Sequence, residues 1–190
     1  MFEKIICSIN SELQRRNIPY MIIGGQAVLL YGEPRLTRDI DITLGVDIDK
    51  IEDVIAVVRD LSCKILPDDV RDFVRKTMVL PAIHEETGIR IDFIFSFSPY
   101  ERQAIAQAKK IRMLDQDVFF AASEDVVIHK IVAGRLRDVE DVRGILLKTQ
   151  DIDMAYIKKW LNDFSTGLED DAIKERLENV LLTIKQNCSI

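Results

Sequence analysis

Apolar positions repeat along the chain with two different periods, which predicts a fold that mixes helices and strands. Near the start they recur at the spacing of one helix face, at Phe2, Ile5, Ile6, Ile9 and Leu13. Residues 38–44 instead alternate polar and apolar side chains, which indicates a strand with one buried face. The first segment lacks the basic start and unbroken apolar run of a signal peptide, so we expect a helix that belongs to the fold.

The rest of the pattern predicts short helices and strands up to residue 122 and helices alone from 123 to 190. An apolar run at 20–23 leads into two glycines and a helix, and two later runs flank a Glu-Thr-Gly turn, as in a hairpin. Pro81 in this hairpin predicts an edge strand or a bulge. Ser123 is the expected N-cap of the helical part. We therefore predict an α/β (α+β) core over 1–122 and a helical extension over 123–190, packed on it.

Composition is that of a compact protein. The 190 residues are 47% hydrophobic and 31% charged, which excludes a disordered chain. No stretch approaches the ~20 apolar residues that a membrane helix needs. The three cysteines are far apart and form no CxxC pair, so neither a disulfide framework nor a thiolate zinc site is indicated. We expect reduced thiols and a cytoplasmic location.

Charge bears on the choice of partners. The net charge of -6 argues against a broad nucleic-acid surface. Segment 102–112 nevertheless contains Arg102, Lys109, Lys110 and Arg112 and no acid. Such a run forms either a solvated face or a patch that contacts phosphate.

Two aspartates in the central strand are the first candidates for chemistry. Asp39 and Asp41 project to the same side, because alternate residues of a strand share a face. Two like charges so close repel unless a cation lies between them, and Mg²⁺ is the ion that carboxylates and phosphates usually bind. The alternative is a pair of acids on a solvated strand face.

Two further features point the same way. Gly24 and Gly25 join a strand to a helix, where free N–H groups and the helix dipole favour phosphate, although glycine also serves such turns for steric reasons. Asp92 interrupts an otherwise apolar strand. A carboxylate there needs a metal, a hydrogen bond, a buried arginine or solvent.

These residues together resemble a known family. Gly24-Gly25, then Arg35-Leu-Thr37-Arg38-Asp39-Ile-Asp41, then Asp92 are similar to the pattern of the polymerase-β-like nucleotidyltransferases. Segment 123–142 resembles the lysine helix and Arg-Asp-x-x-Asp segment of abortive-infection nucleotidyltransferase toxins and their relatives. The resemblance implies a small mixed nucleotidyltransferase sheet flanked by helices.

The resemblance also implies roles for residues. Asp39, Asp41 and Asp92 would be catalytic and bind Mg²⁺, with two ions expected and Mn²⁺ as an alternative. Gly24 and Gly25 would hold the phosphates of an NTP such as ATP, and Lys130 would neutralise the triphosphate or the leaving pyrophosphate. The same pocket would be lined by Arg35, Thr37 and Arg38, and Asp138 is a further candidate.

Several readings of function stay open. The leading one is a metal-dependent transfer of NMP from an NTP to a hydroxyl of an RNA such as tRNA, a protein or a small molecule. The alternative is a non-catalytic module that binds a nucleotide or a partner, including one half of a toxin–antitoxin pair. An antitoxin-like partner would leave an apolar stripe on the last helix uncovered, whereas simple burial would cover it. This stripe consists of Ile173, Leu177, Val180, Leu181 and Ile184.

Overall fold

The computed structural model describes residues 1–96 and 98–187. They divide into two compact units. The first unit contains Met1–Gln26 and Leu36–Ala121, and the second contains Ala27–Arg35 together with the chain from Ala122 onward. The predicted Cys188 thiol lies outside the described residues.

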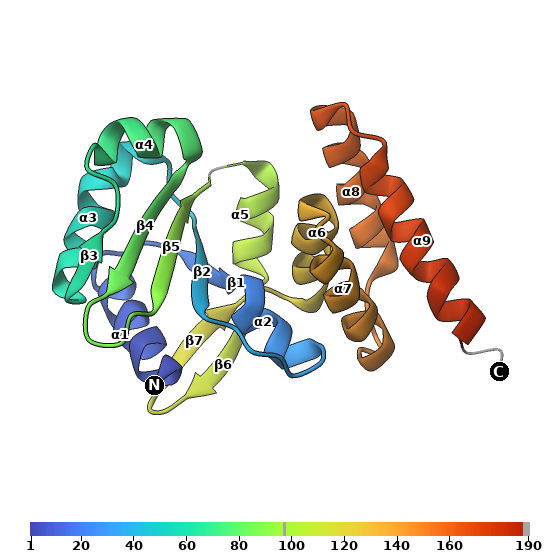
Figure 1. Ribbon diagram of the computed structural model, residues 1–190, viewed down its shortest axis with the longest axis horizontal. Coiled ribbons are helices and arrows are strands. Elements are labelled where there is room, and N and C mark those ends of the chain that lie inside the picture. Colours follow the sequence, from blue (N-terminus) through green and yellow to red (C-terminus); the bar gives the residue numbers. More distant parts are fainter. Residues whose placement is uncertain (97, 188–190) are drawn as a thin grey trace. The chain divides into compact units, whose positions relative to one another are not determined.

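The first unit is built on a mixed sheet with strand order β3-β4-β5-β2-β1-β7-β6 (Figure 1). The central strand β2 pairs in parallel with β5 and antiparallel with β1, while β1 pairs in parallel with β7. The strands are β1 (Tyr20–Ile23), β2 (Asp39–Leu44), β3 (Cys63–Ile65), β4 (Val79–His84), β5 (Arg90–Phe95), β6 (Lys109–Met113) and β7 (Gln116–Phe120).

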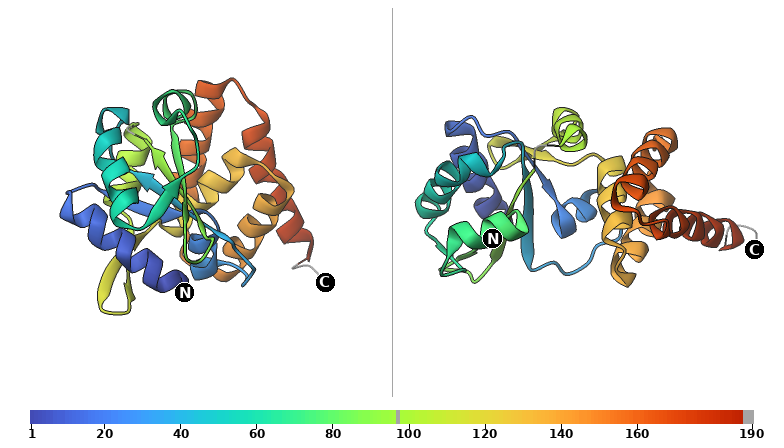
Figure 2. Two further views of the ribbon diagram at one scale, coloured as in Figure 1. Left: turned by 60° about the vertical axis from the view of Figure 1, so that its left-hand side comes forward. Right: turned by 90° about the horizontal axis from the view of Figure 1, so that it is seen from above.

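Helices cover both faces of this sheet. Helices α1 and α3 lie over one face and α5 lies over the other (Figure 2). Alternation along the strands separates the faces: Ile40, Ile42 and Leu44 of β2 are fully buried, whereas Asp39 is exposed. The helices of this unit are α1 (Phe2–Arg15), the 3-10 turn η1 (Ile48–Lys50), α3 (Ile51–Asp60), α4 (Val70–Thr77) and α5 (Pro99–Ala106), together with the start of α2 (Gly24–Tyr31).

The second unit is helical. Helix α6 packs against α7, α8 and α9, and the later part of α2 belongs to the same unit. Most of the apolar stripe of the last helix is turned inward: Ile173, Leu177 and Val180 are each at most 3% exposed, and the other two stripe residues are half-buried. This burial is the simpler of the two outcomes expected for the stripe. The helices are α6 (Ser123–Ala133), α7 (Leu136–Lys148), α8 (Met154–Leu168) and α9 (Ala172–Asn187).

The predicted mixed α+β fold and the β4–β5 hairpin are confirmed, with three local corrections. Strand β3 was not predicted, and it pairs with β4, so β4 is not the edge of the sheet. Pro81 lies just beyond the last β3 pair, that of Ile65 with Ala82, and its carbonyl accepts a bond from the N–H of Leu66. Ala122, not Ser123, is the N-cap of α6. None of the helices in the described part of the chain combines the length and apolar character that a bilayer crossing requires.

Candidate active site

Three aspartates occupy neighbouring positions on two adjacent strands of the sheet in the first unit. In the parallel register of β2 and β5, Asp39 lies opposite Arg90 and Asp41 lies opposite Asp92. Paired residues of neighbouring strands project to the same face, and such strands lie only about 4.8 Å apart. The topology thus brings the three predicted aspartates together, with an arginine among them.

The Gly24 turn lies directly against this patch. Ile23, the last residue of β1, pairs with Asp41, and the next residue is Gly24, where α2 begins. Gly24 has a φ of +63°, and a Cβ atom on it would lie 1.9 Å from Oδ2 of Asp41. The first N–H groups of a helix, here those of Gly24 and Gly25, have no partner within the helix. They lie close to the carboxylate of Asp41, because Gly24 is in contact with it.

Asp39 is held by two neighbours. The buried Thr37 donates a hydrogen bond from Oγ1 to Oδ1 of Asp39, at 2.9 Å. Gln26, in the first turn of α2, donates to the backbone oxygen of Asp39 at 3.3 Å. Gln26 was not predicted from the sequence, where it reads as an ordinary helix residue. Arg38, which was predicted to line the pocket, is exposed.

Arg90 is a second residue of the site that was not predicted from the sequence. Its Nε donates to both carboxylate oxygens of Asp92, at 2.9 and 3.1 Å. The hydrogen bond to Asp92 and the charges of Asp92, Asp39 and Asp41 raise the pKa of Arg90 above its usual value, although burial opposes this. The available signal was spacing, since Arg90 precedes Asp92 by two residues in a strand and must share its face.

The residue types and the strand register fit a divalent cation, but the side chains are not gathered around one point. In the described residues, no group of three or more His, Cys, Asp or Glu side chains is arranged to hold a metal ion. Both oxygens of Asp92 are engaged by Arg90 instead. Turning an aspartate to another staggered rotamer moves its carboxylate without moving the strand, so the donor set suits a cation once Asp92 is released.

The second unit contains a separate, buried ion-pair network around Lys130. Its Nζ lies 2.6 Å from Oδ1 of Asp138 and 3.2 Å from Oδ2 of Asp141, and the side chains of all three are at most 7% exposed. Arg35 donates from Nε and Nη2 to the two oxygens of Asp141, at 2.8 and 2.9 Å. Burial opposes ionisation of Asp138, but hydrogen bonds from Arg135 and Lys130 outweigh it and lower its pKa. Asp141 therefore pairs with both Arg35 and Lys130.

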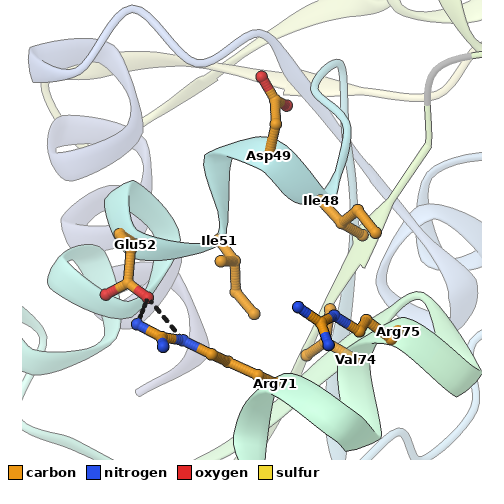
Figure 3. Close-up of a pocket in the computed structure, with 7 residues that line it drawn as sticks. All are labelled: Ile48, Asp49, Ile51, Glu52, Arg71, Val74 and Arg75. Carbon is orange, nitrogen blue, oxygen red and sulfur yellow. Dashed lines mark hydrogen bonds and ion pairs between the residues drawn. The ribbon is translucent and has the colours of Figure 1, made fainter.

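A pocket of about 410 Å³ lies elsewhere in the first unit, between η1, α3 and α4 (Figure 3). Its floor is apolar, and Arg71 at its rim bonds to Glu52. The chain enters η1 after the last residue of β2, whereas Asp39 and Asp41 occupy the first half of that strand. This pocket therefore lies at the other end of β2 and includes none of the predicted site residues.

Solved structures with this fold include nucleotidyltransferases. An antigenic nucleotidyltransferase-like protein from Paracoccidioides brasiliensis has a TM-score of 0.57 and 16% identity, over 90% of this chain and 91% of that one. The lincosamide antibiotic adenylyltransferase LnuA, bound to lincomycin, has a TM-score of 0.54 and 19% identity, over 77% and 97%. ANT(2")-Ia in complex with adenylyl-2"-tobramycin has a TM-score of 0.53 and 16% identity, over 95% and 97%. At such identities these likenesses show the fold.

The family is shown by sequence. A search of curated proteins returns no match. The family model described as "Nucleotidyltransferase of unknown function (DUF6036)", however, matches residues 2–187. The resemblance to polymerase-β-like nucleotidyltransferases is thereby confirmed, whereas the narrower likeness to abortive-infection toxins stays a prediction. The chain belongs to this DUF6036 family and is a nucleotidyltransferase.

Proposed function

We propose that the chain transfers a nucleoside monophosphate from an NTP to a hydroxyl group of an acceptor, with Mg²⁺ as cofactor. The observation that carries the proposal is the shared face of β2 and β5. It presents Asp39, Asp41 and Asp92 beside the glycine that opens α2. Few other chemistries call for three carboxylates next to a helix start that is suited to phosphate.

Each residue of this face has a proposed task. Asp39, Asp41 and Asp92 would hold Mg²⁺, or Mn²⁺ in its place. When bound, the cation supplies charge neutralisation for the triphosphate and makes the acceptor hydroxyl more acidic. Thr37 orients Asp39 through its 2.9 Å hydrogen bond. The N–H groups of Gly24 and Gly25 bind phosphate oxygens of the NTP.

The proposed reaction balances without any covalent enzyme intermediate. The acceptor oxygen forms a bond to the α-phosphorus while the bond from that phosphorus to the β-phosphate oxygen breaks. Pyrophosphate leaves with the bonding electrons, and Asp92 accepts the proton of the acceptor hydroxyl. No nucleophilic side chain is needed.

Three cations carry roles that the family resemblance suggests. Arg38 is exposed at the start of β2, and we propose it as a phosphate contact. Lys130 and Arg35 are likewise proposed to act on the triphosphate. Both residues also form ion pairs within the helical unit, so mutation must separate a contact with the triphosphate from a role in those pairs.

Three classes of acceptor are proposed: the 3′ end of an RNA such as tRNA, a protein side chain, and a small molecule. Two fold neighbours were solved with antibiotic compounds, LnuA with lincomycin and ANT(2")-Ia with adenylyl-2"-tobramycin, which favours including small hydroxyl compounds in the assay. The exposed Arg102, Lys109, Lys110 and Arg112 favour including RNA. We also propose an antitoxin-like protein partner and a cytoplasmic location.

The test is a transfer assay with purified protein, Mg²⁺ and each of the four α-³²P-labelled NTPs. Total tRNA, a cell lysate and a panel of aminoglycosides and lincosamides serve as acceptors. Asp41→Asn should abolish transfer, whereas Asp68→Asn, the same change at an exposed site before α4, should leave it intact. Metal-dependent NTP binding with no transfer to any acceptor would favour the non-catalytic alternative, and absence of NTP binding would overturn the proposal.

A further inference from the structure

We propose that Arg90 is the internal counter-ion of the metal-free site, and that a divalent cation binds by taking Asp92 from it. This inference rests on the proposed function, because it concerns the same carboxylates. It adds that metal binding is an exchange of one positive charge for another. Arg90 would therefore set the affinity of the site for its metal.

The geometry places Arg90 where such an exchange can happen. Asp39, Asp41, Arg90 and Asp92 form a block of two adjacent register pairs on one sheet face. A single nitrogen of Arg90, Nε, reaches both oxygens of Asp92. A cation that ligated Asp92 would need at least one of the same two oxygens. The guanidinium and the metal therefore compete directly for one carboxylate.

Electrostatics gives the reason for an arginine at this position. Three carboxylates on neighbouring strand positions repel one another, and a nearby cation relieves that repulsion. Arg90 is the cation whose register position falls inside the block, and it lies directly opposite Asp39. Without metal, its guanidinium pairs with Asp92 and offsets part of the negative charge of this face. With metal, the repulsion is relieved by the metal ion instead.

Exposure makes the exchange feasible. The Asp92 side chain is 19% exposed, while that of Arg90 is 54% exposed. A half-exposed arginine can swing into solvent at little cost once its partner is taken, because its head group regains water. Asp92 cannot leave as easily, since its side chain is shorter and less exposed. The moving partner is therefore Arg90.

The experiment compares metal binding in the wild-type chain and in Arg90→Gln, by calorimetric titration with Mg²⁺ and with Mn²⁺ and no nucleotide present. Removing the competing guanidinium should tighten binding about fivefold, the value expected for a partly exposed ion pair of ~1 kcal/mol. The metal-free Tm of Arg90→Gln should fall, and the rise in Tm on adding metal should exceed that of the wild type. Arg90→Lys keeps the charge with a single-point donor and should lie between the two.

A matched control is Arg112→Gln. Arg112 also extends from a strand, its side chain is similarly exposed, and it pairs with an aspartate, Asp117, at 3.2 Å. Its removal should not change metal affinity. Unchanged or weaker metal binding in Arg90→Gln, with a wild type that binds metal, would overturn the counter-ion role alone. A wild type that binds neither Mg²⁺ nor Mn²⁺, with or without NTP, would overturn the proposed metal site and the inference with it.

Discussion

Gly24 and Asp41 are in such close contact that a Cβ atom on the glycine would lie 1.9 Å from Oδ2 of the aspartate. Real Cβ atoms do not approach an oxygen so closely, so any other residue at this position must displace the carboxylate or the turn. The φ of +63° at Gly24 adds a second reason for glycine. The glycine turn and the aspartate strand, far apart as sequence motifs, are therefore parts of one structure.

Gly24→Ala should abolish metal-dependent NTP binding, because the new methyl group pushes Asp41 away. Gly88→Ala is the control for backbone strain, since Gly88 has a φ of +68° and no atom within 4 Å of an added Cβ. Both variants should lose about 1 kcal/mol of stability from the left-handed backbone. Urea unfolding measures this loss, and nucleotide titration should separate the two variants. Equal NTP binding by both would show that the contact with Asp41 has no functional role.

Thr37→Val should lower kcat/KM about tenfold while the fold is kept. The change removes the hydroxyl that donates to Oδ1 of Asp39 at 2.9 Å, and a hydrogen bond to a charged group contributes ~1.5 kcal/mol. Thr37→Ser keeps the hydroxyl and should keep most of the activity. Steady-state kinetics with the acceptor found in the transfer assay would check both. A Val variant as active as the wild type would mean that Asp39 needs no orienting bond.

The sequence predicted what depends on local pattern. The alternation of residues 38–44 was enough to place Asp39 and Asp41 on one face, and the turn chemistry around Gly88 was enough for the β4–β5 hairpin. Strand β3 was missed because its residues, Cys63–Ile65, are too few to show a period. Because β3 was not predicted, the expectation that Pro81 marks an edge strand was also wrong.

What depends on distant pairing could not be predicted. Local spacing could have indicated the bond from Arg90 to Asp92. The position of Arg90 opposite Asp39, however, requires β5 to lie beside β2 in one particular register, which no local pattern encodes. Likewise, Arg35 was assigned to the nucleotide pocket with its neighbours in the motif. Its partner Asp141 lies 106 residues away, in helix α7 of the same unit. The assignment of Ala27–Arg35 to the helical unit is equally non-local.

Lys130→Met should destabilise the protein by about 3 kcal/mol. It leaves the buried Asp138 and Asp141 without a shared cation, and uncompensated buried charge is costly. Lys158→Met is the control, because Lys158 pairs with Glu178 at 3.7 Å with both side chains more than half exposed. That variant should change stability by less than about 1 kcal/mol. Urea unfolding of the two variants measures the difference.

The same Lys130 variant tests the proposed catalytic role. At a temperature where Lys130→Met is fully folded, a phosphate contact predicts a raised KM for the NTP or a lowered kcat. Wild-type kinetics under those conditions would show that Lys130 serves only the ion-pair network. Arg35→Gln, which removes the bidentate pair with Asp141, allows the same separation of stability from kinetics.

Stability should fall between pH 7 and pH 5 because of His129. Loss of hydration inside the folded protein and, to a lesser degree, the Lys130 ammonium lower the pKa of this histidine to about 4, from about 6.5 in an unfolded chain. Between these two pKa values the histidine is protonated in the unfolded chain but not in the folded chain, so the free energy of unfolding drops as the pH falls. The loss should reach about 2 kcal/mol at pH 5.

Urea unfolding at a series of pH values would measure this loss, and His129→Leu should remove most of the dependence of stability on pH. Equal slopes in the wild type and His129→Leu would assign the pH dependence to other groups.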